Sequence, residues 1–551
     1  MADEDFDRYV EKFFRATMER HPVVATFIGL HEYDHLLSEN SRQFFVDEVN
    51  FLRDHRKRFK AFEPQELSGS RPLDRELALY LFDLELFKLE EMRQWESLPN
   101  GAEGLGEALF PLFTRDFAPL DQRLGSITAR LEMGPRYLEG LKTRISRPVK
   151  LWTEMALEAS ERLPSFVNLI YKTAEGKASK DTLTSLGKAI QESQAALEEY
   201  EEWLREDVLP RATEAHILGE ERFRRLLELR HLGYRLEEVR DLGLRYLQET
   251  KEELRDLARR IDPQATVEEV SERIKANHPG TFNEVLETVR RAIDEARSFV
   301  KERQLATLPP TERLTVTETP TFLRPILPFA AYFPPAKFDR VQEGVYVVTP
   351  PEDGHELLRE HNHASIRNTA VHEGYPGHHL QLSAANLNPS LLRQLTLGVS
   401  AAETVEGWAH YCEDMMQETG FSDLPEVRFI QLQDIIWRAC RIVIDVDLHC
   451  GRMSFEEAVE MLVREVGMEK SSAVAEVKRY TQYPTYQLSY LLGKHLIKAL
   501  REEVERRMGD RFSYAFFHDT ILYSGSLPFF LLRRVVEDKL SKLEEGVEDL
   551  Y

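Results

Sequence analysis

Hydrophobic residues recur at helical spacing along most of the chain. In residues 181–205 and 236–260, apolar positions return every three or four residues with charged residues between them, as in a helix packed on one face. Prolines interrupt the pattern, for example at Pro148 and Pro210. The sequence therefore predicts a large, mainly α-helical protein. No fixed repeat length is visible, so a helical solenoid is not favoured.

The pattern changes character between residues 307 and 350. Leu314–Thr319 and Gly344–Thr349 are rich in β-branched residues and are followed by prolines, which predicts two strands. We expect a small antiparallel sheet beside the helix that follows. If Gly344–Thr349 is an edge strand, it can bind an extended peptide through backbone hydrogen bonds. A hairpin that only packs on helices fits the pattern equally well.

The change of pattern also suggests two regions. Residues 1–300 would form an N-terminal helical region that walls a substrate channel. Residues 301–551 would form a catalytic region with the sheet, the metal-site helices and the C-terminal helices.

Residues 372–379 read His-Glu-Gly-Tyr-Pro-Gly-His-His, close to the zinc motif H-E-x-x-H. In that motif two histidines one turn apart bind zinc, and the glutamate is the general base. Here Pro376 takes the place of the second histidine, and on a regular helix His378 would lie about 120° around and ~9 Å along the axis from His372. A bulge at Pro376-Gly377 would bring His378 back. The alternative is a simple proline-glycine helix end.

A second helix, predicted from residue 402 to 413, carries Glu403, Glu406, His410 and Glu413 along one stripe. Glu406 lies 28 residues after His378. A glutamate from a following helix completes a His₂Glu zinc site that leaves one position for water. We therefore predict His372, His378 and Glu406 as ligands of one zinc ion, with Glu373 as general base. His379 competes with His378 as the second histidine ligand, and an ordinary solvated acidic face would also explain the stripe.

Together these motifs resemble the family called DUF885, which is grouped with gluzincin-like zinc metallopeptidases. Its hallmarks, H-E-x-x-P-G-H and E-G-W-A-x-Y, are present at residues 372–378 and 406–411. The family's opening, its R-x-x-x-D-x-x-x-H helix and its closing segment resemble residues 21–29, 441–449 and 525–528. Where the family usually reads P-G-Q-A-L-x-Y, residues 484–490 read Pro-Thr-Tyr-Gln-Leu-Ser-Tyr. The resemblance implies a gluzincin-like fold and a metal-dependent peptidase.

Two further groups would serve the site. Arg441, Asp445 and His449 share one face of an apolar helix, and buried charges there need partners. Asp445 would accept the second ring N–H of a zinc-bound histidine, and Arg441 or His449 would bind a substrate carboxylate. A self-contained ladder in the core is the alternative. Among several nearby tyrosines, the resemblance selects Tyr490 as donor to the oxyanion.

Composition limits the classes of function. The net charge of −23 argues against nucleic-acid or anionic-membrane partners, and no apolar run is long enough to span a membrane. Three cysteines and an acidic N-terminus without signal-peptide features favour the cytoplasm. We therefore predict a cytoplasmic zinc metallopeptidase for short peptides. The alternatives are a zinc hydrolase of a non-peptide amide or ester, and a catalytically inactive helical scaffold. Cleavage preference and oligomeric state do not follow from the sequence.

Overall fold

A computed structural model describes residues 2–320, 324, 330–350, 355–396 and 400–545, and the side chains of 355–357 are left aside. The chain forms two compact units. Unit 1 comprises Met1–His216 with residues 336–340, and unit 2 comprises Ile217–Pro335 with Val341–Tyr551. The division therefore falls near residue 216, whereas the sequence suggested 300. The helices between these positions pack within unit 2, with α10 (Leu236–Ile261) along α16 (Pro425–His449) and α12 (Phe282–Glu302) against the strand β1 (Arg313–Glu318).

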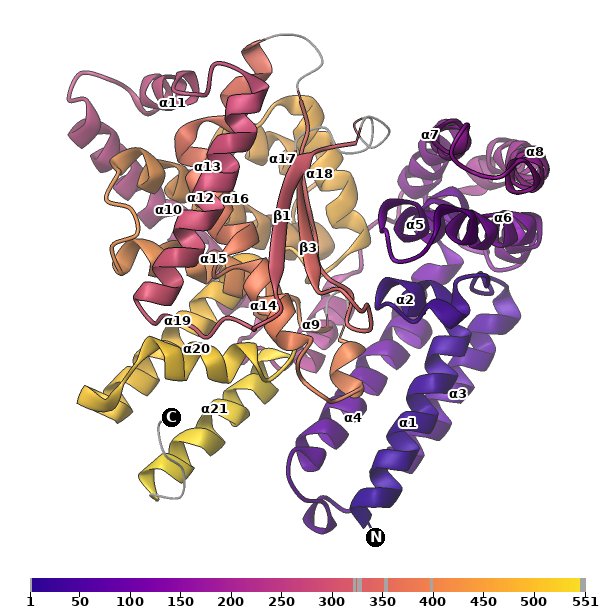
Figure 1. Cartoon of the computed structure of the whole chain (residues 1–551), viewed down its shortest axis with the longest axis horizontal. Coiled ribbons are helices and arrows are strands. Elements are labelled where there is room, and N and C mark those ends of the chain that lie inside the picture. The colour runs from indigo at the N-terminus through magenta and orange to yellow at the C-terminus, as the bar shows by residue number, and fades with distance from the viewer. Residues whose placement is uncertain (1, 321–323, 325–329, 351–354, 397–399, 546–551) are drawn as a thin grey trace. The chain divides into compact units, whose positions relative to one another are not determined.

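Unit 1 is helical (Figure 1). Its core includes a cluster of aromatic rings in which Phe13 contacts Phe59 and Phe82. The buried Arg130 donates hydrogen bonds to the Thr26 hydroxyl and the Leu36 carbonyl, which ties the family-like opening segment to α6. The contacts of residues 21–29 therefore stabilise the fold of unit 1. The helices of unit 1 are α1 (Ala2–Arg20), α2 (Pro22–Phe27), α3 (Arg42–Lys60), α4 (Arg71–Phe87), α5 (Gly101–Thr114), α6 (Leu120–Lys142), α7 (Lys150–Ala174) and α8 (Lys180–Trp203).

Unit 2 consists of helices and one small sheet (Figure 1). The α16 helix is buried along much of its length, and charged residues such as Arg441, Asp445 and Asp447 are buried among its apolar residues. The helices are α9 (Glu220–Leu229), α10 (Leu236–Ile261), α11 (Val267–Ala276), α12 (Phe282–Glu302), α13 (His363–Thr369), α14 (His378–Ala385), α15 (Ala402–Glu418), α16 (Pro425–His449), α17 (Phe455–Met461), α18 (Lys470–Gln482), α19 (Ser489–Met508), α20 (Tyr514–Leu522) and α21 (Phe529–Glu544).

The sheet contains the two predicted strands and one that the sequence did not indicate. Its strands are β1 (Arg313–Glu318), β2 (Ala330–Phe333) and β3 (Glu343–Val348), in the order β1-β3-β2. The β2–β3 pair is antiparallel but β1 runs parallel to β3, so the sheet is mixed and not wholly antiparallel. Because β3 is the central strand, Gly344–Thr349 offers no edge to a peptide, and that expectation was wrong. The edges of the described sheet belong to β1 and β2.

Two glycines allow α15 and α19 to approach each other closely. A Cβ atom on Gly407 would lie 2.5 Å from the backbone of Gly493, and one on Gly493 would lie 2.0 Å from the carbonyl oxygen of Glu403. No larger residue fits at either position. The crossing brings Tyr486, just before α19, into contact with Glu406 on α15. The mainly α-helical class is confirmed, and the segments predicted as helices correspond to α8, α10, α15 and α16.

Candidate metal centre

The helical structure is interrupted between His372 and His378. After α13, residues Ala370–Gly374 form a π-helical turn, and α14 begins at His378. A Cβ atom on residue 377 would lie 1.9 Å from the carbonyl oxygen of His372, so only glycine can occupy this place. The Gly377 N–H instead donates to the carbonyl of Val371 at 3.1 Å. The chain therefore folds back on itself within a few residues. The predicted interruption at Pro376-Gly377 is present, but it separates two helical segments and is not a bulge within one continuous helix.

The second family motif, on α15, stabilises the segment between the two helices through a hydrogen bond. The indole Nε1 of Trp408 donates a 2.8 Å hydrogen bond to the carbonyl oxygen of Pro376. That carbonyl lies outside any regular helix, and Trp408 is completely buried, so the indole provides the partner that a buried carbonyl needs. Tyr411, on the same helix, bonds the buried His518 at 2.9 Å. The E-G-W-A-x-Y motif thus fixes the first motif as well as supplying Glu406.

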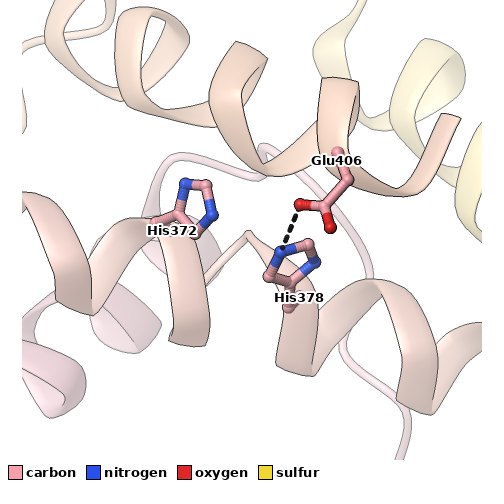
Figure 2. Close-up of side chains that lie close together, drawn as sticks. All are labelled: His372, His378 and Glu406. Carbon is pink, nitrogen blue, oxygen red and sulfur yellow. Dashed lines mark ion pairs between the residues drawn. The ribbon is translucent and has the colours of Figure 1, made fainter. Parts of the chain in front are cut away.

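His372, His378 and Glu406 come together at this point. Figure 2 shows His372 at the end of one helical segment, His378 at the start of the next, and Glu406 reaching towards them from a third. One potential ligand atom from each residue lies within 4.8 Å of the other two. The two imidazole rings are 4.9 Å apart and nearly perpendicular, and Nε2 of His378 is 3.5 Å from a carboxylate oxygen of Glu406.

The donor set fits zinc. Two imidazoles and one carboxylate are the usual ligands of a catalytic zinc ion, whose donor atoms lie roughly 3.3 Å from one another when each is about 2.1 Å from the metal. The three candidate donors, which lie within 4.8 Å of one another, are close to that spacing. Burial alone would raise the pKa of Glu406, but the adjacent His378 and His372 lower it to about 2. Glu406 is therefore an anion, as a metal ligand must be.

Glu413 determines which nitrogen of His372 faces the site. A carboxylate oxygen of Glu413 lies 2.6 Å from Nδ1 of His372. An ionised carboxylate only accepts hydrogen bonds, so Nδ1 carries the proton and Nε2 remains available as a ligand. Burial lowers the pKa of His372, but Glu413 outweighs this effect and raises it to about 9. Without an ion the ring is therefore protonated at neutral pH, and Nε2 would release its proton when a metal ion binds. On its other side Glu413 accepts a hydrogen bond from Asn368 at 3.2 Å.

Glu373 has a different environment from that of the three ligand candidates. It is half-buried, and among the described residues no donor bonds its carboxylate. Its charge contributes to raising the pKa of Tyr332 and Tyr346, after the larger effect of burial on both groups. The carboxylate therefore lies on the side of β2 and β3, and no described partner restrains it.

His379 points into a separate buried cluster. Its Nε2 lies 2.9 Å from a carboxylate oxygen of Glu312, and its Nδ1 lies 3.0 Å from the Tyr332 hydroxyl. Tyr375 donates to the same carboxylate, and Arg297 forms an ion pair with it at 2.9 Å. Both ring nitrogens of His379 are therefore engaged away from Glu406. The structure brings His378 to the candidate metal site and leaves His379 in the core.

Of the α16 residues, Asp445 and His449 differ from expectation. Asp445 accepts hydrogen bonds from the backbone N–H groups of Thr485 and Leu488, at 3.1 and 3.2 Å, so it holds the segment before α19. Burial raises its pKa to about 7. His449 lies 3.1 Å from the Tyr480 carbonyl and stacks near Phe223. Neither bonds a ligand candidate. The expectation that Asp445 orients a zinc-bound histidine was wrong, because Glu413 takes that position.

The tyrosines near Glu406 form a pair. The Tyr486 hydroxyl donates to Glu406 at 2.9 Å, and the rings of Tyr486 and Tyr490 are 6.0 Å apart. The family resemblance indicates Tyr490 and gives no role to Tyr486, which directly contacts the site. The sequence also places Glu413 in the polar stripe but indicates no role for it. The i, i+7 spacing of Glu413 from Glu406 was the available signal, since it places both on one helix face.

The comparisons with known proteins identify the family. Residues 22–536 match the model described as "Bacterial protein of unknown function (DUF885)". Because this match covers most of the chain, the protein belongs to the DUF885 family. No protein with a curated description matches it.

Two solved structures share the fold. A protein from Shewanella oneidensis, described as a "putative lipoprotein of unknown function", has a TM-score of 0.80 and 24% identity, with 97% of this chain and 99% of that chain covered. A "putative lipoprotein" from Colwellia psychrerythraea has a TM-score of 0.84 and 18% identity, with 98% and 100% covered. At these identities the likeness concerns the fold alone. Within the described residues, no helix is long and apolar enough to cross a membrane.

Proposed function

We propose that this protein is a zinc-dependent metallopeptidase of the gluzincin type that hydrolyses short peptides. The observation that carries the proposal is the convergence of His372, His378 and Glu406 on one point, with Glu413 holding Nδ1 of His372. A scaffold has no need of two imidazoles and an ionised carboxylate facing one another. One zinc ion per chain, held by these three residues, would supply an acidified water and a Lewis acid for the scissile carbonyl.

Side chains of the protein would carry out the proton transfers. The Glu373 carboxylate would accept a proton from the attacking water and deliver it to the amine that leaves when the C–N bond breaks. Its lack of a described donor supports this role, because a free carboxylate can turn to receive a proton. Tyr490 would donate its hydroxyl hydrogen to the oxyanion, with Tyr486 holding Glu406 in place.

The test uses the whole protein purified without added metal. We expect about one equivalent of zinc after reconstitution, hydrolysis of a library of short peptides read by mass spectrometry, and loss of hydrolysis with a chelator. Glu373→Gln should bind zinc normally and lose roughly 10²–10⁴-fold in turnover. Less than about 0.2 equivalents of zinc would favour the inactive scaffold. Zinc binding with turnover only of non-peptide amides or esters would favour that class of hydrolase.

Location is a separate question. The sequence predicts the cytoplasm, whereas the two structural relatives are each described as a "putative lipoprotein", which fits attachment at a membrane surface. A peptidase of this kind would act on short peptides in either compartment. Fractionation of the native host with an antibody against this chain distinguishes the two.

A further inference from the structure

Arg441 is a buried cation beside the proposed active site, and its hydrogen-bonding capacity is only partly used. The residue is 4% exposed. Its Nε donates to the Tyr480 hydroxyl at 2.9 Å, and its Nη2 lies 3.0 Å from a carboxylate oxygen of Glu476. Its remaining nitrogen, Nη1, has no partner among the described residues. The guanidinium lies 4.2 Å from the ring centre of Trp437 and 4.6 Å from that of Tyr490.

The charges around Arg441 do not balance. Arg479 forms an ion pair with the same oxygen of Glu476 at 2.9 Å, so two guanidinium groups share one carboxylate. One positive charge is left over, in a chain whose net charge is −23. A desolvated cation is costly unless an anion accompanies it. The neighbouring aromatic rings compensate for only part of that cost.

This unbalanced pair lies close to the candidate metal ligands. The Tyr486 hydroxyl lies 2.9 Å from Glu406, and the ring centres of Tyr486 and Tyr490 are 6.0 Å apart. The guanidinium of Arg441 lies 4.6 Å from the ring centre of Tyr490. Only two aromatic side chains therefore separate Glu406 from Arg441. An extended peptide spans ~3.5 Å per residue, so a few residues beyond the scissile bond would cover this path.

We infer that Arg441 and Arg479 bind the C-terminal carboxylate of the peptide, so that the enzyme cleaves near the free C-terminus of its substrate. The inference rests on the proposed peptidase function and defines its substrate class. A guanidinium matches a carboxylate geometrically and supplies paired hydrogen bonds. The free Nη1 of Arg441 and the half-exposed Arg479 provide these donors, and the substrate carboxylate supplies the missing negative charge. His449, the other candidate for this role, is already engaged in the core.

The first experiment compares acetylated tetrapeptides prepared as free acids and as C-terminal amides. With the zinc-loaded protein, we expect kcat/KM for the acids to exceed that for the matched amides by roughly 10–100-fold, mainly through KM. The cleaved bond should lie at a fixed distance from the C-terminus. Equal hydrolysis of acids and amides, or cleavage at positions unrelated to the C-terminus, would overturn the inference and leave the proposed function intact.

Three variants separate binding from a structural role. Arg479→Gln should raise KM for the acids about tenfold and leave KM for the amides nearly unchanged. Glu476→Gln should lower KM for the acids, because it removes the carboxylate that competes with the substrate. Arg533→Gln, on the surface of α21, removes the same charge elsewhere and should change neither value. If both Arg479→Gln and Glu476→Gln alter only thermal stability, the cluster is structural and the inference is wrong.

A binding measurement distinguishes this failure from failure of the proposed function. Trp437 lies against Arg441, so its fluorescence should report occupancy of the cluster. Glu373→Gln protein, loaded with zinc, should bind the free acids and not the amides, with fluorescence change and affinity both reduced by Arg479→Gln. Such binding in a protein that hydrolyses no peptide would refute the peptidase and retain the carboxylate site. No discrimination between acids and amides would refute the site.

Discussion

Glu413 lies 2.6 Å from Nδ1 of His372 and leaves the opposite ring nitrogen facing His378 and Glu406. Burial would raise the pKa of Glu413, but His410 and His372 hold it well below its usual range. The ionised carboxylate therefore fixes both the tautomer and the orientation of His372. Outer partners of this kind strengthen a metal site without contacting the metal.

Replacing Glu413 should therefore weaken zinc binding without abolishing it. We expect Glu413→Gln to lower zinc affinity roughly 10–100-fold, measured by competition with a chromophoric chelator. Asp445→Asn is the matched comparison, because Asp445 is an equally buried acid on α16 that accepts hydrogen bonds from backbone N–H groups and lies 3.8 Å from His449, which is not a ligand candidate. It should reduce thermal stability and leave zinc affinity within about threefold of the wild type. The reverse pattern would return Asp445 to the role that the sequence suggested.

Much of the fold follows from the sequence because helical periodicity is a local property. The α8 and α10 helices lie within a few residues of their predicted positions. The β2 strand, Ala-Ala-Tyr-Phe, is short and lacks alternation, so its pairing with β3 depends on the tertiary structure. The parallel alignment of β1 with β3 likewise depends on the path of the intervening chain, which strand propensity does not record.

Only those features of the candidate site that depend on residue spacing along the chain could be predicted from the sequence. The interruption of the helix could be predicted from Pro376 and Gly377, because their backbone properties are local. The choice of Glu413 over Asp445 depends on how α15 and α16 are rotated around the interruption after His372. Helical spacing predicts which residues share one face of a helix, but it does not predict which other helix that face packs against. For the same reason Tyr486, brought to Glu406 by the Gly407–Gly493 crossing, could not be separated from Tyr490.

Single substitutions should distinguish ligands from neighbours. His372→Ala, His378→Ala and Glu406→Ala should each lose bound zinc, because each removes one of three protein donors. His379→Ala should retain about one equivalent, although it removes one of the partners of the buried Glu312 and should lower the melting temperature. Elemental analysis after gel filtration gives the stoichiometry. Zinc retained by His378→Ala and lost by His379→Ala would reverse the assignment.

A histidine in unit 1 should make stability depend on pH. His31 lies between Asp34 and Asp339, at 2.9 and 2.8 Å. Burial lowers the pKa of His31, but the two carboxylates outweigh it and raise the pKa to about 9. The folded state therefore binds the proton more tightly than the unfolded state. The resulting stabilisation is complete below about pH 6.5 and is lost as the pH rises towards 9.

Denaturant unfolding at pH 6 and pH 9 measures this effect. The pKa difference corresponds to at most about 3 kcal/mol, and partial exposure reduces it to about 1–2 kcal/mol. His31→Gln should be less stable than the wild type at pH 6 and similar to it at pH 9. His35→Gln alters an exposed histidine four residues away and should keep the wild-type pH dependence. An unchanged pH dependence in His31→Gln would show that other groups cause it.

Gly377 provides the most direct test of the interrupted helix. The added methyl group in Gly377→Ala would lie 1.9 Å from the carbonyl oxygen of His372, and backbone cannot yield as a flexible side chain does. The turn must therefore open, which moves His378 away from His372 and disturbs the Pro376 carbonyl that Trp408 bonds. We expect zinc binding to be lost and unfolding free energy to fall by about 1–3 kcal/mol or more. Gly125→Ala on α6, where an added methyl group meets nothing within 4 Å, should bind zinc normally and be as stable as the wild type or slightly more so. A stable Gly377→Ala protein with a full equivalent of zinc would mean that the two histidines do not depend on this turn to meet.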